Sequence, residues 1–283
     1  MALNLDVVGR TWESVPVSYD EDAVSLYAIG IGAGVKELDF VYEKNLKVFP
    51  TFSVIPFMPL LFSRIVPEAN INVVTLLHGE HKIIMHQPLP PSATVHTSLT
   101  IDSIYDKGDK GAVINLTLAT LDETGAPLFD NKAVLVDRSG GNFGGDRGPK
   151  TIPVEPPEGQ EPDFRVEQSI PVNQAALYRL SGDKNPLHID PDFAREAGFD
   201  RPILHGLCAF GYAGRAILHT ACCGDPARLK SFSVRFMNVV FPGDTLTTRG
   251  WKVDGGRSFI VQTTNQDGKV VLGNALAEIA SRA

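Results

Sequence analysis

Cysteine is scarce in this sequence, and its placement excludes two common uses of the residue. The three cysteines are Cys208, Cys222 and Cys223. An odd number that contains an adjacent pair matches neither a disulfide framework nor a CxxC zinc or redox site. We therefore expect a protein of a reducing compartment, the cytoplasm.

The chain also has little positive charge and no long apolar run. It contains 26 Lys and Arg against 33 Asp and Glu, a formal net charge of −7, so nucleic acid is not an expected partner. Its longest apolar stretch, residues 54–66, holds two prolines and an arginine and is shorter than the roughly 20 residues of a membrane helix. The N-terminus lacks a basic start followed by an apolar core, so we expect neither a signal peptide nor a membrane partner.

The remaining composition is that of a folded globular protein. Hydrophobic residues make up 43% and charged residues 21% of the 283 positions, which excludes disordered and coiled-coil classes and allows two domains. Residues 140–163 are rich in Gly, Pro and charge and show no apolar period, which is typical of a linker. We divide the chain into a first half (1–139), this linker (140–163) and a second half (164–283).

The two halves align with each other at a nearly constant offset. Residues 27–30 (YAIG) match residues 178–181 (YRLS), 151 positions later, and residues 89–91 match residues 241–243, 152 positions later. Two anchors at almost one offset predict that the chain is a duplication.

The second half has the pattern of an α+β unit. Turn and cap residues predict short helices over residues 174–180, capped by Asn173, and from residue 191, capped by Asp190 and closed by Gly198. Residues 205–220 are apolar on nearly all sides, which predicts a buried helix. Strand-like runs follow at 232–240, 245–253, 258–264 and 269–279. The short turns between them predict antiparallel pairing, with the sheet wrapped around the helix.

The chemically most capable residues gather in one segment, YRLSGDKNPLHID, residues 178–190. Gly182, Asp183, Asn185 and Pro186 are turn formers, so we interpret the segment as a loop between two helices. A turn at this place can direct Asp183 and His188 into one cavity, although each residue taken alone is more often only a turn former or a structural histidine.

This segment resembles a known signature. GDKNPLH, residues 182–188, followed by RPILHG, residues 201–206, is similar to the motif of the MaoC-like, type 2 enoyl-CoA hydratases, the (3R)-specific kind found in peroxisomal multifunctional enzymes and their bacterial relatives. The resemblance extends to LLHGE (76–80), YDKG (105–108) and GGNFGG (140–145) in the rest of the chain. It implies an α+β double hot dog fold, in which two helix-wrapped-by-antiparallel-sheet repeats form a pseudo-dimer.

Carried onto this sequence, the resemblance implies catalytic roles for four residues. Asp183 and His188 would hold and activate water, Asn185 would help to position it, and the Gly206 N–H would form an oxyanion hole. Gly206 also suits that role physically, because free N–H groups and the helix dipole favour negative charge at a helix start. The resemblance further implies substrate contacts at His78, Gly79, Lys107, Lys184, Pro186, Leu187 and Phe236.

The implied activity is reversible addition of water to trans-2-enoyl-CoA, giving (3R)-3-hydroxyacyl-CoA. The acyl-CoA is the substrate, and we expect no metal, no cofactor and a homodimer. At the 151-residue offset, Gly32 and Glu37 stand at the positions of Asp183 and His188. We therefore expect one active site per chain, with a first half that binds the acyl chain and CoA and has room for long or bulky acyl groups.

Other readings of the same residues are possible. Asp183, His188 and His205 could form a metal site, but their spacing matches no standard zinc signature. Ser181, His188 and Asp190 could suggest a serine hydrolase, but no G-x-S-x-G elbow surrounds Ser181. A hot-dog acyl-CoA thioesterase or a non-catalytic acyl-thioester binding protein remains the alternative, because a fold does not determine a function.

Overall fold

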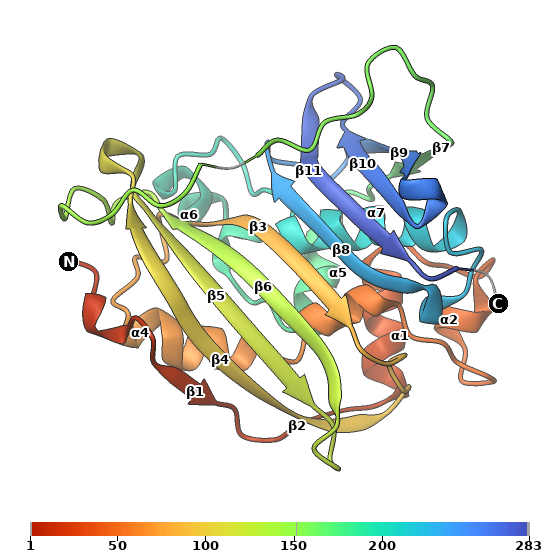
Figure 1. The fold of residues 1–283 in the computed structure, drawn as a ribbon, viewed down its shortest axis with the longest axis horizontal. Coiled ribbons are helices and arrows are strands. Elements are labelled where there is room, and N and C mark those ends of the chain that lie inside the picture. The colour runs from red at the N-terminus through yellow and green to blue at the C-terminus, as the bar shows by residue number, and fades with distance from the viewer. Residues whose placement is uncertain (1, 151, 282–283) are drawn as a thin grey trace.

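A single antiparallel sheet of 11 strands dominates the molecule (Figure 1). The structure, a computed structural model, describes residues 2–150 and 152–281. Residue 1 of the predicted first half, residue 151 of the linker and residues 282–283 of the second half lie outside the described residues. The strands are β1 (Thr11–Glu13), β2 (Val17–Tyr19), β3 (Leu76–Met85), β4 (Ala93–Asp106), β5 (Ala112–Leu121), β6 (Pro127–Asp137), β7 (Phe164–Ser169), β8 (Leu229–Phe236), β9 (Thr245–Val253), β10 (Ser258–Thr264) and β11 (Val270–Ile279).

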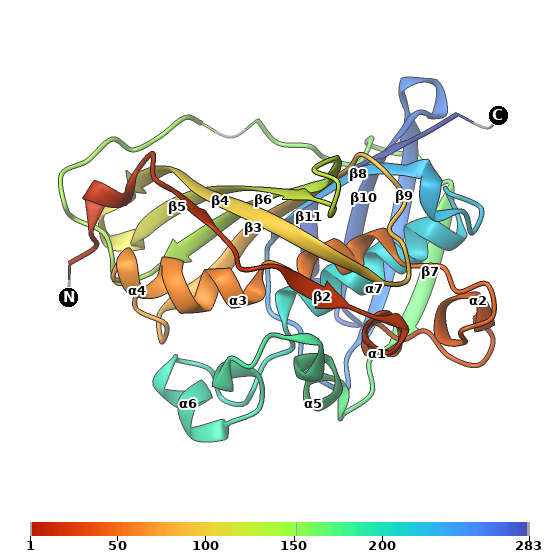
Figure 2. The same ribbon diagram turned by 90° about the horizontal axis from the view of Figure 1, so that it is seen from below.

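The helices lie on one side of the sheet, as the view from below shows (Figure 2). They are α1 (Glu21–Gly30), α2 (Leu38–Val41), α3 (Met58–Leu60), α4 (Val66–Glu68), α5 (Gln174–Tyr178), α6 (Pro191–Glu196) and α7 (Gly206–His219). Helices α3, α4 and α7 pack directly beneath the sheet, and α1, α5 and α6 lie further from it. This arrangement is the α+β architecture that the strand and helix pattern predicted.

The strand order confirms the repeat. Along the sheet the strands follow the order β1-β4-β5-β6-β3-β8-β11-β10-β9-β7. The first five belong to the first half of the chain, and the last five are their counterparts from the second half in reverse order. The halves join where β3 pairs antiparallel with β8, and there Lys82 faces Ser233, its counterpart 151 residues later. At this junction the pairing is therefore consistent with the offset found between the two halves of the sequence.

The predicted elements of the second half form close to their expected positions, one strand has different bounds, and β7 was not predicted. Helix α7 is buried, and β9 and β10 have the predicted bounds. The expected strand 232–240 instead spans Leu229–Phe236. The Met237 N–H still bonds to the Val271 carbonyl of β11, and the segment then turns toward the start of α7, where the Val240 carbonyl accepts a hydrogen bond from the Leu204 N–H at 2.7 Å.

The two predicted caps have different outcomes. Asp190 caps α6 as expected, since its carboxylate accepts hydrogen bonds from the N–H groups of Asp192 and Phe193. Asn173 precedes α5 but makes no side-chain cap hydrogen bond, so that prediction was wrong. The backbone of Asn173 has φ −96° and ψ 9° rather than the extended conformation that aims a cap side chain at the next N–H groups.

Prolines interrupt the helical run beneath the first half of the sheet. Pro50–Glu68 passes through short 3₁₀, α and π segments, with prolines at 50, 56, 59 and 67 that remove N–H donors. Within the described residues this 19-residue run, of mean hydropathy 1.2, is long and apolar enough to cross a membrane by length and composition alone. It is 67% buried inside the fold, as the core helix of a globular protein would be.

Candidate active site

Two successive turns shape the loop between α5 and α6. Gly182 ends the helical segment with a φ of +146°, a conformation that favours glycine. The Asp183 carboxylate then accepts the Asn185 N–H at 3.0 Å, and the Asn185 side-chain oxygen accepts the Leu187 N–H at 3.0 Å. A single 3₁₀ turn, Pro186–His188, follows. These local hydrogen bonds bring Asp183 and His188 to the same side of the loop.

The ring of His188 is held by a hydrogen bond at one of its two nitrogens. Its Nδ1 lies 2.9 Å from the Ile203 carbonyl, and because a carbonyl only accepts, Nδ1 carries the proton and Nε2 keeps a lone pair. Burial lowers the pKa of His188, against the raising effects of Asp183 and of the Ile203 hydrogen bond. His188 is therefore a neutral imidazole with an available acceptor nitrogen at neutral pH.

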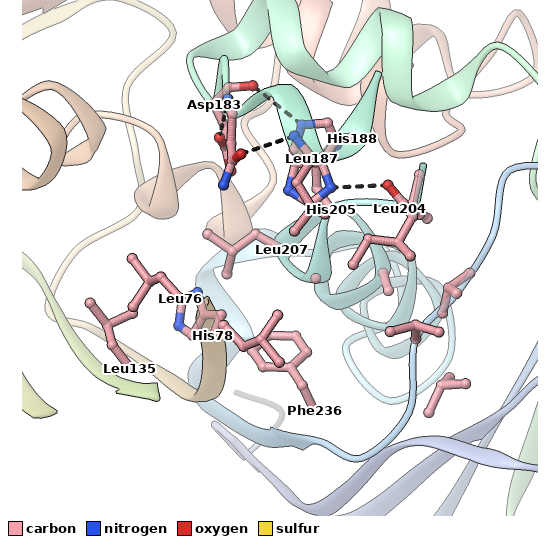
Figure 3. Close-up of a pocket in the computed structure, with 18 of the residues that line it drawn as sticks. Leu76, His78, Leu135, Asp183, Leu187, His188, Leu204, His205, Leu207 and Phe236 are labelled. Carbon is pink, nitrogen blue, oxygen red and sulfur yellow. Dashed lines mark hydrogen bonds between the residues drawn. The ribbon is translucent and has the colours of Figure 1, made fainter. Parts of the chain in front are cut away.

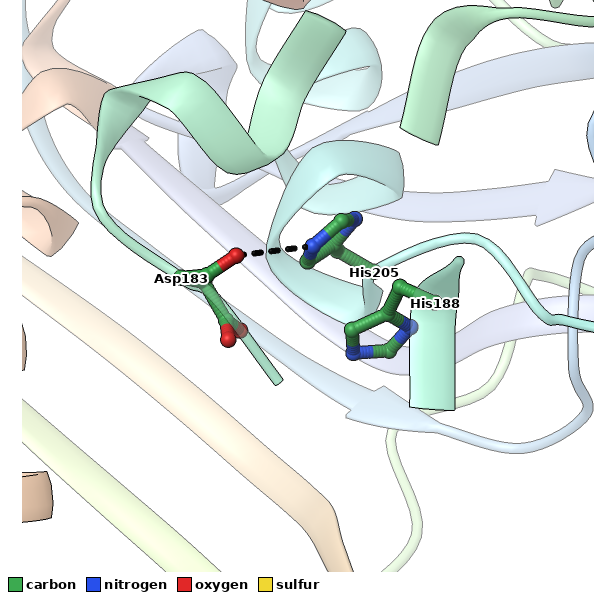
Figure 4. A group of neighbouring side chains, drawn as sticks. All are labelled: Asp183, His188 and His205. Carbon is green, nitrogen blue, oxygen red and sulfur yellow. Dashed lines mark hydrogen bonds between the residues drawn. The ribbon is translucent and has the colours of Figure 1, made fainter. Parts of the chain in front are cut away.

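Asp183 and His188 meet a third residue, His205, at the start of α7. One ring nitrogen from each histidine and one carboxylate oxygen of Asp183 lie within 4.8 Å of one another. The His205 Nε2 lies 3.2 Å from the Asp183 carbonyl oxygen, and the His205 and His188 ring centroids are 3.8 Å apart (Figure 4). The structure thus brings the side chains of Asp183 and His188 close together. The sequence analysis had considered His205 only as a possible metal ligand.

Gly206 is the first residue of α7, directly beside this cluster. The first N–H groups of a helix have no partner within the helix and carry its positive dipole end. A Cβ atom at Gly206 would lie 3.2 Å from two ring atoms of Phe236. Glycine therefore keeps the N–H approachable between the cluster and the Phe236 ring.

These residues line one cavity of about 220 Å³ (Figure 3). Most of its other walls are apolar, and many come from the first half of the chain or from the ends of β8 and β11. The first-half residues are Met58, Leu61, Phe62, Leu76, Leu77, His78 and Leu135. The second-half residues outside the signature are Leu207, Ala209, Phe236, Met237, Asn238, Val239, Val240, Val271 and Leu272. The sequence analysis did not find the walls formed by residues 58–62, although they lie in the apolar stretch noted at residues 54–66.

Not all of the predicted contact residues reach this cavity. Asp183, Asn185, Leu187, His188, Gly206, His78 and Phe236 line it, whereas Gly79, Lys107, Lys184 and Pro186 are not among its lining residues. Gly79 lies against β6, where a Cβ atom would be 3.2 Å from the Val134 carbonyl oxygen. Lys107, in the β4–β5 turn, donates a hydrogen bond to the Arg147 carbonyl. A contact between substrate and these four residues stays a prediction and would be made outside the cavity.

His78 reaches the cavity from a buried hydrogen-bonded chain. The Asn131 amide donates to the Ser53 carbonyl, so its oxygen accepts from His81 Nε2 at 3.0 Å. His81 Nδ1 is then an acceptor for His78 Nε2, 3.2 Å away. Burial lowers the pKa of His78 to about 4 and that of His81 well below its usual range. Both rings are neutral, and His78 is locked beside Phe236, with ring centroids 5.0 Å apart.

The geometry also tests the two alternative hypotheses for this site, a metal site and a serine-hydrolase triad. In the cluster of Asp183, His188 and His205, the His205 Nε2 donates to the Asp183 carbonyl, so only Nδ1 of that ring keeps a lone pair for a metal. The carboxylate of Asp190 caps α6, and His188 Nδ1 is bonded to Ile203. A Ser181–His188–Asp190 triad is therefore not formed.

At the equivalent place in the first half, the dyad positions have different partners. A Cβ atom at Gly32, the counterpart of Asp183, would lie 2.6 Å from the Tyr212 ring. Glu37, the counterpart of His188, accepts hydrogen bonds from Arg215 Nε at 2.8 Å and from His219 Nε2 at 2.6 Å. This region joins the first half to α7 through an ion pair, and it holds no second Asp–His dyad.

Replacing Glu37 by glutamine is expected to lower the free energy of unfolding by about 3 kcal/mol at pH 7. Burial alone would raise the pKa of Glu37, but hydrogen bonds from His219 and Arg215 and the charge of Arg215 lower it to about 2. The stabilisation is present above the ordinary pKa of 4.5 and is lost as the pH falls from 4.5 toward 2. Urea unfolding at several pH values measures it, with the exposed Glu43→Gln as control. Equal stability of the Glu37→Gln variant and wild type at pH 7 would contradict the assignment.

Comparison with known protein families divides the chain between two descriptions. Residues 17–139 match the model of the MFE-2 hydratase 2 N-terminal domain, and residues 153–274 match the model of the MaoC like domain. Together the two models account for most of the chain.

Individual proteins agree with these families. The chain is 39% identical to the "Probable enoyl-CoA hydratase 2" of Dictyostelium discoideum, over 93% of this chain and 92% of that protein. It is also 39% identical to the "Peroxisomal multifunctional enzyme type 2" of Mus musculus. That match covers 96% of this chain but only 38% of the longer mouse protein. Among solved structures, a MaoC-like dehydratase from Phytophthora capsici is 32% identical, with a TM-score of 0.85 over 99% of this chain and 98% of that one.

Proposed function

The chain belongs to the family of MaoC-like hydratase 2 proteins, and from that membership we propose that it is a (3R)-specific 2-enoyl-CoA hydratase. The reaction is the reversible addition of water to trans-2-enoyl-CoA, which gives (3R)-3-hydroxyacyl-CoA. The observation that carries the proposal is the convergence of Asp183 and the free Nε2 of His188 at the start of α7, on the wall of an apolar cavity. A thioester carbonyl at the Gly206 N–H would place the reacting carbons beside the dyad.

The dyad residues have complementary tasks in this reaction. A water molecule is held by the Asp183 carboxylate and by Nε2 of His188, which accepts one of its protons as the oxygen bonds to carbon 3. The π electrons of the double bond move toward the thioester oxygen, and the Gly206 N–H stabilises the resulting enolate. The proton taken from water is returned to carbon 2, so that one water molecule is consumed and no redox change occurs.

Hydration of trans-2-decenoyl-CoA tests the function directly. We expect loss of the enoyl-thioester absorbance and formation of a product that only an R-specific 3-hydroxyacyl-CoA dehydrogenase oxidises. Release of free CoA thiol without hydration would instead identify the thioesterase alternative. Binding without either reaction, in a folded preparation, would identify an acyl-thioester binding protein.

The activity is expected to keep its neutral base well into the acidic range. Because burial lowers the pKa of His188 below its usual 6.5, Nε2 stays unprotonated at pH 6.5 and is lost as a base only at lower pH. The acidic limb of the kcat/KM profile should therefore be centred below pH 6.5. A limb centred above that value would contradict an acting base of this kind.

The cavity walls from the first half are expected to set the acyl preference. The walls are apolar around Met58, Leu61 and Leu135, and we propose that acyl chains longer than four carbons bind against them. Leu61→Trp should lower kcat/KM for decenoyl-CoA more than for crotonyl-CoA, and Leu61→Ala should spare long substrates. The same enoyl assay measures both substrates. A wild-type rate that falls steeply beyond four carbons would overturn the proposal.

Cofactor use, location and assembly complete the proposal. We propose that the reaction needs no metal or cofactor, so that EDTA leaves the rate unchanged. We also propose a cytoplasmic homodimer, and the buried thiols of Cys208 and Cys222, which form no disulfide, support the reducing compartment. The mouse relative is named as peroxisomal, so microscopy of the tagged full chain separates diffuse from punctate location. Light scattering then separates twice the 30.6 kDa chain mass from the chain mass itself.

A further inference from the structure

His205 belongs to the polar cluster of the cavity, but the proposed reaction assigns it no step. It precedes Gly206 in the chain and is only 1% exposed. Its ring lies near two others, with centroid distances of 3.8 Å to His188 and 4.9 Å to Tyr178. A buried imidazole in such a place requires a compensating hydrogen bond, because desolvating a polar ring is costly.

That hydrogen bond goes to the main chain of the catalytic loop. His205 Nε2 lies 3.2 Å from the Asp183 carbonyl oxygen, as the dashed line in Figure 4 shows. Since the carbonyl only accepts, Nε2 carries the proton and Nδ1 is left with a lone pair. Nδ1 has no hydrogen-bond partner within the described residues. Within the described residues, the hydrogen bond to the Asp183 carbonyl is thus the polar contact that explains a histidine at this position.

The surroundings keep the ring neutral. The titratable groups facing it are Asp183 and His188 from the loop, Tyr178 from α5 and Arg179 from the following turn. Burial, together with His188 and Arg179, lowers the pKa of His205 well below its usual range, while the bond to Asp183 raises it. A neutral ring can stack on His188 without the repulsion that two imidazolium ions would have.

We propose that His205 is a positioning residue that holds Asp183, His188 and the Gly206 N–H in one rigid unit. Its hydrogen bond holds the Asp183 main chain, its ring supports the His188 ring, and its own backbone leads directly into Gly206. The three reacting groups come from separate places in the sequence, and small displacements between them are costly for catalysis. The proposal rests on the hydratase function proposed above.

Two substitutions separate the hydrogen bond from the ring. His205→Phe keeps an aromatic ring but leaves the Asp183 carbonyl without its donor, and we expect kcat to fall by about 10²-fold with little change in KM. His205→Gln can place an amide N–H near the position of Nε2 and should recover at least a part of that loss. A phenylalanine variant that is as active as wild type, or more active than the glutamine variant, would overturn the proposal.

A double-mutant cycle tests whether His205 acts through the dyad. In an Asp183→Asn background, His205→Phe should lower the residual rate by much less than it lowers the wild-type rate, because the group it positions is already lost. Equal effects in both backgrounds would show that His205 acts independently of Asp183. Failure of the hydratase function is distinguished from this result, since it would appear as an inactive wild type or as an unaffected Asp183→Asn variant.

The ring tautomers provide a test that does not depend on activity. In a long-range ¹H–¹⁵N spectrum of the wild-type protein at pH 7, we expect a neutral His205 protonated at Nε2 and a neutral His188 protonated at Nδ1. The assignments come from the loss of each signal in His205→Gln and His188→Gln. A His205 protonated at Nδ1, or a charged His205, would contradict the hydrogen bond to Asp183 and with it the proposal.

Discussion

Replacing Asp183 by asparagine is expected to lower kcat for enoyl-CoA hydration by at least about 10³-fold while the protein stays folded. The asparagine oxygen can still accept the Asn185 N–H, so the turn that Asp183 forms is preserved. The carboxylate charge that holds the reacting water and steadies a protonated His188 is lost. Steady-state hydration and thermal unfolding of the same preparation measure the two effects.

A variant of the other dyad residue and a matched surface variant serve as the comparison and the control for this result. His188→Ala should lower kcat by a similar factor, because it removes the only base nitrogen that the Ile203 carbonyl leaves free. Asp200→Asn, the same chemical change at an exposed position beyond α6, should leave the rate unaltered. Near-wild-type activity of the folded Asp183→Asn or His188→Ala variant would remove the dyad assignment.

Replacing Gly206 by alanine is expected to lower kcat/KM by about 10²-fold. The N–H donor remains, but the added Cβ atom lies 3.2 Å from two atoms of the Phe236 ring, so one of the two groups must shift. Either movement displaces the donor from the thioester oxygen or narrows the approach to it. The change tests geometry at the start of α7 rather than the presence of a donor.

A compensating change and a control make this prediction specific. Phe236→Leu removes the ring that the new Cβ atom meets, and combined with Gly206→Ala it should recover part of the lost activity. Gly34→Ala adds the same methyl group at a position with nothing within 4 Å and should have no effect. If the Gly206→Ala variant were as active as wild type, the close approach to the Gly206 N–H beside the Phe236 ring would not be required for catalysis.

The Asp–His dyad could be predicted from sequence because its geometry is local. Asp183, Asn185 and His188 are ordered by hydrogen bonds that span two residues and by one proline, and such turn chemistry is readable in a short segment. The helix that starts at Gly206 and the antiparallel strands after it were also visible, since their patterns have a short period. The duplication of the chain was visible as one offset between the halves.

The tertiary structure alone decided which residues surround the dyad. The strand expected at 232–240 ends at Phe236, and the segment after it is held by a hydrogen bond between Val240 and Leu204, which no local pattern contains. The first-half walls at Met58 and Leu61 meet the second half only after the chain folds.

The same distinction applies to the predicted contacts and to His205. Whether Gly79 and Lys107 contact the cavity depends on the packing of strands and turns distant in sequence, and both lie outside its lining. His205 is 22 residues from the carbonyl that it holds. The sequence by itself thus indicated the family through its motif, and it indicated the turn from Asp183 to His188 and the helix beside it because these depend on short-range bonds and periodic burial. Only the fold decided the cavity and its supporting residues, because these depend on contacts between distant segments.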